Sequence, residues 1–106
     1  MDFEKLCEQE HPEGSPFTLE ECLEVFHYFF RKYEDFTGKP HPPLKGEQIH
    51  RIMVKMPYLD DYPIEPESYK AMIDKYFRTP FPDCDYRINH FFSGQIRRLR
   101  YYEECY

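Results

Sequence analysis

The sequence predicts an all-α fold, a compact bundle of four to five helices. Apolar residues recur at spacings of three and four along several segments, and no segment alternates apolar and polar residues long enough to form a strand. Proline and glycine fall between the periodic segments, where they end helices. The 106 residues include ten Phe and ten Tyr, enough large side chains for one dense core. We therefore expect a single helical domain over residues 18–106.

The first 17 residues have a different character. They contain Gly14, two prolines and four glutamates with little helical periodicity. Such a composition is typical of a solvated segment rather than of a packed element. We expect residues 1–17 to form an acidic N-terminal arm that leads into the domain.

The first helix of the domain has clear boundaries. Thr18 and Glu21 have the spacing of a capping box, in which each side chain accepts from the other's backbone amide. Gly38 suits the left-handed position that ends a helix, and prolines follow it. The apolar face between these ends is about 160° wide at 100° per residue, and it comprises Leu19, Cys22, Leu23, Val25, Phe26, Phe29, Phe30, Tyr33 and Phe36. A face this broad must contact at least two neighbouring elements.

Two further helices follow from the same spacing. The second covers about residues 45–56 and ends at Pro57, and its apolar positions are Ile49, Ile52, Met53 and Met56. The third begins near Pro66, which suits the first helical position, and ends near Arg78. Its apolar stripe comprises Tyr69, Met72, Ile73, Tyr76 and Phe77.

A last helix is expected to run towards the C-terminus, with Asp83 or Asp85 as its N-cap. Ser93-Gly94 interrupts it, either as a tolerated weak point or as a break between two shorter helices. One side of it carries Ile88, Phe92, Gln95, Leu99, Tyr102 and Tyr106. Across the whole bundle, six side chains are expected to be almost fully buried, namely Phe26, Phe30, Ile52, Ile73, Phe92 and Leu99.

The cysteines and histidines do not have the spacing of a metal site. Structural zinc needs two closely spaced ligand pairs, whereas Cys22 lies on the apolar face and His27 about 140° away from it. We therefore expect no metal, and we expect Cys22 to be a core residue. The acidic start and the lack of an apolar run of about 18 residues favour a cytoplasmic protein. In that compartment thiols stay free, and the chain has four, Cys7, Cys22, Cys84 and Cys105.

No residue pattern indicates an enzyme or a cofactor. The carboxylates that flank Cys84, those of Asp83 and Asp85, work against a nucleophilic thiolate, so helix capping is the better interpretation of this triplet. Asp60-Asp61 is best interpreted as a solvated surface pair. The sequence also lacks the phosphate-binding, serine-nucleophile and zinc-protease motifs.

Charge is distributed in segments along a chain of net charge −6. Residues 1–36 hold ten acidic and three basic side chains, net −7, whereas residues 86–106 hold two acidic and four basic ones, net +2. On the first helix Tyr28 falls nearly opposite the apolar face, among glutamates. An amphipathic aromatic residue in an acidic surface is typical of a protein interface, so the expected partner-binding residues are Glu20, Glu21, Glu24 and Tyr28. Such a surface can also imitate a phosphate backbone and occupy a basic groove.

The last helix offers an alternative. Its cationic and polar residues are spaced to form a stripe that contacts phosphates, and they are Arg87, His90, Arg97, Arg98, Arg100 and Tyr101. The competing interpretation is that these arginines pair with Glu103, Glu104 and the acidic first helix. The negative net charge favours pairing, because it repels a polyanion.

Three stretches carry a resemblance: TGKPHPP at residues 37–43, DYRINHFFSG at 85–94 and RYYEE at 100–104. Together they resemble small helical proteins of phages and integrative elements of gut Firmicutes. The resemblance implies a binding role and supplies no site residues. Our leading hypothesis is a non-enzymatic interaction protein of a mobile element, such as an anti-CRISPR-like inhibitor of host defence. The alternative is a DNA-associated replication or regulatory protein.

Overall fold

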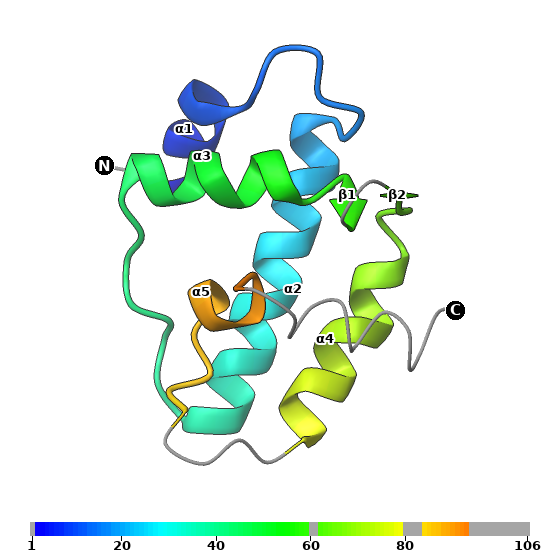
Figure 1. The fold of residues 1–106 in the computed structure, drawn as a ribbon. Coiled ribbons are helices and arrows are strands. Elements are labelled where there is room, and N and C mark those ends of the chain that lie inside the picture. Colours follow the sequence, from blue (N-terminus) through cyan, green and yellow to red (C-terminus); the bar gives the residue numbers. More distant parts are fainter. Residues whose placement is uncertain (1, 60–61, 80–83, 94–106) are drawn as a thin grey trace.

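The computed structural model describes residues 2–59, 62–79 and 84–93. In these ranges the chain forms five helices and one antiparallel hairpin (Figure 1). The helices are α1 (Phe3–Glu10), α2 (Leu19–Thr37), α3 (Gly46–Lys55), α4 (Ser68–Arg78) and α5 (Ile88–Phe91), and the strands are β1 (Tyr58–Leu59) and β2 (Tyr62–Pro63). The predicted helical bundle is confirmed in its main features. The short hairpin was not expected, because two-residue strands leave no alternating pattern.

Helix α2 begins and ends where the sequence predicts. The Thr18 backbone amide donates to Glu21 Oε1 at 2.8 Å, and the Glu21 amide donates to Thr18 Oγ1 at 3.1 Å. At the other end Gly38 has a φ of 77° and donates its amide to the Glu34 carbonyl. These contacts satisfy backbone groups that a helix otherwise leaves unpaired. They fix which residues of α2 face its neighbours.

The other elements are arranged around α2 (Figure 1). Helix α4 runs beside α2 in the same direction, and α3 crosses the N-terminal half of α2. Residues 38–45 run back along α2 to reach α3. Helix α5 lies against α2 and α4, because the Phe91 ring contacts Phe29 and Tyr76. This arrangement gives α2 neighbours on several sides, as its broad apolar face requires.

The first 17 residues do not form an arm of irregular structure. Residues 3–10 are helix α1, which begins where Asp2 Oδ1 accepts from the Glu4 amide at 3.2 Å. Cys7 is fully buried, and the Phe3 ring packs against Phe26 at 5.2 Å between centroids. The helical signal was weak because α1 has only three apolar residues among glutamates. The packing partners on α2 and α3 supply the stability that the segment lacks alone.

The core largely agrees with the expected set. Phe26, Ile52, Ile73 and Phe92 are all buried. Phe30 is only half-buried, and this part of the prediction is wrong, because Phe3 and His41 cover its ring without enclosing it. Leu99 lies outside the described residues. The centre of the core is aromatic, and Phe29 contacts the rings of Tyr76, Phe77 and Phe91.

Of the expected last helix, the structure describes the four residues of α5. The N-cap of α5 is Arg87, so the prediction of Asp85 as the N-cap is wrong. Asp85 lies two residues earlier, where its Oδ1 accepts from the Arg87 amide at 3.1 Å and shapes the turn before the helix. The helix ends at Phe91, and the Ser93 hydroxyl donates to the His90 carbonyl at 2.7 Å. Asp83 and the remainder of the expected helix from residue 94 lie outside the described residues. No described helix has the length and apolar content that crossing a membrane requires.

Candidate functional site

A groove of about 210 Å³ lies between α2 and α4. Three of the four predicted partner-binding residues, Glu21, Glu24 and Tyr28, line it; the fourth, Glu20, is exposed on the same helix and does not line it. The remaining lining residues are Val25, Pro66, Glu67, Tyr69, Lys70 and Ile73. We call this site the α2–α4 groove.

The α2–α4 groove combines an apolar floor with an acidic rim. Val25, Tyr69 and Ile73 are buried core residues, whereas Glu24, Glu67 and Lys70 are exposed. Three carboxylates against one ammonium give the lining an excess of two negative charges. An apolar floor accepts the aliphatic stem of a long basic side chain, and carboxylates attract its charged end. The groove therefore has the chemistry to bind arginine or lysine.

The α4 contribution was missed at the level of sequence. Glu67 and Lys70 belong to an acidic segment, residues 60–85, that holds seven acidic and three basic side chains. That composition shows the charge of the segment, but nothing in it shows which turn of α4 lies beside Glu21 and Glu24. The pairing of the two helices is a tertiary feature, and it becomes visible only in the folded chain.

Tyr28 does not point away from the protein as predicted. Its side chain is half-buried, and its hydroxyl donates to Asp74 Oδ1 on α4 at 2.5 Å. Lys32 Nζ lies 3.3 Å from the same oxygen, and the Arg31 guanidinium lies over the Tyr28 ring at 5.2 Å. The prediction was wrong because α4 packs beyond the edge of the apolar arc and covers a position that the helical wheel places outside.

Burial, together with the hydrogen bond to Asp74 and the charge of that residue, raises the pKa of Tyr28 to about 12. The phenol therefore stays protonated and remains a donor to Asp74. This contact joins α2 to α4, so Tyr28 acts as a fixed wall of the α2–α4 groove rather than as a freely moving anchor.

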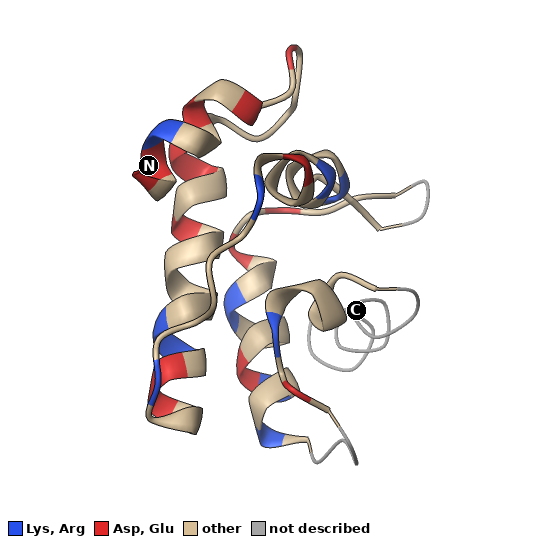
Figure 2. Ribbon diagram, turned by 90° about the vertical axis from the view of Figure 1, so that its left-hand side faces the viewer, with Lys and Arg blue, Asp and Glu red and all other residues tan. Residues whose placement is uncertain are grey.

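Acidic residues are not confined to this groove. Figure 2 shows red segments on α1 and towards both ends of α2, with a blue segment before the C-terminal red one. What distinguishes the α2–α4 groove from the other acidic surface is its apolar floor between two helices. Charge alone gives long-range attraction, whereas a concave apolar floor adds contact area.

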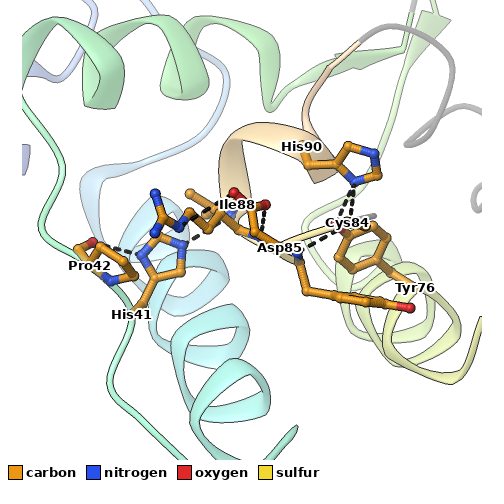
Figure 3. Close-up of polar contacts among 9 residues, drawn as sticks. His41, Pro42, Tyr76, Cys84, Asp85, Ile88 and His90 are labelled. Atoms are coloured by element: carbon orange, nitrogen blue, oxygen red, sulfur yellow. Dashed lines mark hydrogen bonds and ion pairs between the residues drawn. The ribbon is translucent and has the colours of Figure 1, made fainter. Parts of the chain in front are cut away.

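The alternative nucleic-acid set does not form a stripe in the part of the chain that is described. Arg87 is exposed, and its Nε lies 3.5 Å from Asp85 Oδ2. His90 faces inwards, because its Nδ1 lies 2.6 Å from the Tyr76 hydroxyl and 3.3 Å from Cys84 Sγ (Figure 3). His90 therefore does not take the place in a phosphate-contacting stripe that its spacing predicted. Arg97, Arg98, Arg100 and Tyr101 lie outside the described residues.

A second polar centre surrounds His41, which the sequence did not single out (Figure 3). His41 Nε2 accepts from the Ile88 amide at 3.0 Å, so Nδ1 carries the proton and donates to the Pro42 carbonyl at 2.8 Å. The ring packs against aromatic side chains of α2, including Phe30 and Tyr33. Burial lowers the pKa of His41, which favours this neutral form. His41 thus ties the segment after α2 to the start of α5.

The described cysteines fall into two environments. Cys7 and Cys22 are fully buried, and burial raises the pKa of each to about 12; the core position expected for Cys22 is confirmed. Cys84 is half-buried, and all three thiols are free. Within the described ranges, no three His, Cys, Asp or Glu side chains gather as metal ligands.

Comparison of the chain with known protein families, curated proteins and solved structures found no match. The resemblance to proteins of phages and integrative elements therefore stays a prediction, and the function has to be argued from the α2–α4 groove.

Proposed function

We propose that this protein is a non-enzymatic interaction module that binds a basic segment of another protein in the α2–α4 groove. The observation that carries the proposal is that Glu21 and Glu24 of α2 lie with Glu67, the N-cap residue of α4, around an apolar floor. An arginine or lysine of the partner inserts its stem over the floor and places its charge among the carboxylates. Tyr28 contributes a rigid wall, which lowers the entropy lost on binding.

The partner class follows from charge. Basic, concave surfaces are characteristic of proteins that bind nucleic acids, and an acidic protein that docks on them competes with the phosphate backbone. The resemblance to proteins of mobile elements favours a bacterial host target of this kind. We therefore propose a cytoplasmic inhibitor of host defence, anti-CRISPR-like in its action, as the biological role.

The alternative function, DNA binding by the C-terminal residues, receives less support. His90 belongs to an inward-facing cluster, and Arg87 has an acidic neighbour in Asp85. Phosphate contacts need cations that are available to the duplex. The two described members of the set do not offer such a surface.

The experiment compares two variants with the same change in net charge. E21Q/E24Q/E67Q removes the carboxylates of the α2–α4 groove, and Gln at position 21 retains the capping box. The matched control, E8Q/E34Q/D35N, neutralises three exposed acidic residues that do not line the groove. Both variants and the wild type are immobilised and used to capture proteins from a nuclease-treated bacterial lysate.

We expect the wild type and the control to retain the same basic protein and the groove variant to lose it. The captured protein should elute with salt, because the attraction is between charges near the surface. Equal capture by the groove variant would refute the site. Capture that is seen with an untreated lysate and disappears with the nuclease-treated one, together with submicromolar binding of duplex DNA that R97A/R100A abolishes, would establish the alternative function instead.

A further inference from the structure

Three side chains from separate segments converge behind the turn that precedes α5. Cys84 Sγ lies 3.3 Å from Nδ1 of His90, and the Tyr76 hydroxyl of α4 lies 2.6 Å from the same nitrogen and 3.6 Å from the sulfur (Figure 3). A thiol within reach of an imidazole is the arrangement that activates a cysteine nucleophile. The α2–α4 groove does not include these residues, so this cluster is a separate site.

A backbone amide also points at the sulfur. The Tyr86 amide donates to Cys84 Sγ at 3.1 Å. Tyr86 has a φ of 57°, which is a rare conformation for a bulky residue and costs free energy. The Tyr86 hydroxyl, which donates to the Thr79 carbonyl at 2.9 Å, and the Tyr86 ring, which stacks on Phe77, hold the turn in place. The strained turn thus directs an N–H donor at the thiol.

The phenol of Tyr76 supplies another donor. Burial is the main cause that raises the pKa of Tyr76, followed by its hydrogen bond to Cys84, so the phenol keeps its proton. When the proton of the thiol moves to His90 Nδ1, the imidazolium can donate to both the sulfur and the phenol oxygen. The phenol proton is then directed to the sulfur. The cluster therefore offers a thiolate donors from the imidazole, the phenol and the Tyr86 amide.

The charges around the cluster have opposite effects. Asp85 disfavours a thiolate at Cys84, but its carboxylate accepts from the Arg87 amide and lies 3.5 Å from Arg87 Nε. The guanidinium of Arg87 offsets part of the Asp85 charge. A proton on His90 Nδ1 would place a cation 3.3 Å from the sulfur.

We propose that Cys84 and His90 form a thiolate–imidazolium pair, which makes Cys84 the site at which this chain is oxidised by hydroperoxides. The thiolate attacks one peroxide oxygen, so that an S–O bond forms and the O–O bond breaks. The sulfur is oxidised by two electrons to a sulfenic acid, and the peroxide is reduced. His90 gives its Nδ1 proton to the leaving oxygen, which departs as water or an alcohol.

The chain contains its own controls. Cys7 and Cys22 are fully buried thiols whose pKa is raised, so they should not react while the protein is folded. Cys105 lies outside the described residues and is replaced by serine in every protein of the experiment. His90→Asn retains a hydrogen-bond donor but cannot carry the proton.

The test measures alkylation of C105S and C105S/H90N by iodoacetamide across a range of pH, with intact-protein mass as the readout. We expect Cys84 of C105S to react at about pH 6, and about tenfold more slowly in the His90→Asn protein. Hydrogen peroxide with dimedone should then label Cys84 alone. Profiles that coincide in the two proteins, or labelling of Cys7 or Cys22 instead, would overturn the proposal.

A second measurement leaves His90 unchanged. The ultraviolet absorbance of the thiolate is obtained as the difference between C105S and C105S/C84S, and it is followed with pH. We expect the signal to persist at about pH 6, well below the range in which an unperturbed thiol ionises. A signal that appears only above about pH 8 would refute the ion pair.

Discussion

The α2–α4 groove and the turn around α5 use polar residues in opposite ways. In the groove, Glu24 on α2 and Glu67 at the N-cap of α4 are exposed, and their positions follow from the helical backbone. Around α5, two half-buried histidines contact groups of buried residues: His41 contacts the Ile88 amide, and His90 contacts the Tyr76 hydroxyl. The difference indicates that the first region is available to a partner. In the second region, the polar groups already form hydrogen bonds with other groups of the same chain.

The largest expected effect comes from the aromatic residue that supports the α5 region. Phe29 is fully buried and contacts His41, Tyr76 and Phe91. Phe29→Ala should lower the free energy of unfolding by about 3 to 5 kcal/mol, because it leaves a cavity in the core. Denaturant unfolding measures this change.

Phe30→Ala is the control for this prediction, since Phe30 is half-buried beside Phe29 on the same helix. It removes the same number of atoms at a more open position, so the expected loss of stability is smaller. Equal losses of stability from the two substitutions would contradict the prediction that the buried Phe29 ring supports the α5 region.

A smaller effect is expected on the groove side from Tyr28→Phe. The substitution removes the hydrogen bond to Asp74 and leaves the ring in place. The free energy of unfolding should fall by about 1 kcal/mol, since Asp74 is partly solvated and still has Lys32 beside it. Thermal unfolding of the wild type and the variant gives the difference. No change in stability would mean that this contact does not hold α2 against α4.

The smallest expected effect is on the pH dependence of stability, and it comes from His41 in the α5 region. Burial lowers the pKa of His41 below its usual 6.5, and the charge of Arg87 acts in the same direction. The hydrogen bond to Pro42 and the charge of Asp85 oppose this shift. At pH values between the lowered pKa and 6.5, His41 is therefore protonated in the unfolded chain and neutral in the folded chain. The stability due to neutral His41 is present above the unfolded value of 6.5 and is lost as the pH falls through the lowered pKa.

His41→Gln keeps an acceptor near the Ile88 amide but cannot titrate. Its melting temperature should fall less than that of the wild type as the pH is lowered from about 7.5 to about 5. The other four histidines contribute equally to both proteins. Parallel curves for the two proteins would contradict the role assigned to His41.

Features set by contacts between residues close in sequence were predicted, whereas features set by long-range contacts were not. Thr18, Glu21 and Gly38 set the ends of α2 through contacts of three or four residues, and all three roles were predicted. Tyr28 was misplaced because Asp74, which holds it, is 46 residues away. The tie between His41 and Ile88 spans 47 residues and left no local signal.

The candidate sites show the same division. Glu21 and Glu24 were predicted from their own helix, whereas Glu67 required the packing of α4 against α2. Cys84 was judged from its flanking carboxylates, which work against a thiolate, and the sequence did not show that His90, six residues away, lies beside the sulfur. The positive φ of Tyr86, which brings an amide to the sulfur, cannot be read from residue types, because tyrosine has no preference for that conformation.

A titration of the ¹⁵N-labelled protein with an arginine-rich peptide, followed by amide chemical shifts, shows directly whether the α2–α4 groove binds basic side chains. A peptide of the same length in which glutamate replaces each arginine serves as the control. We predict saturable shifts at Val25, Tyr28, Glu67 and Lys70, which are absent with the control peptide and in E21Q/E24Q/E67Q. Shifts of equal size over all the acidic surfaces, or shifts unchanged in the groove variant, would contradict it.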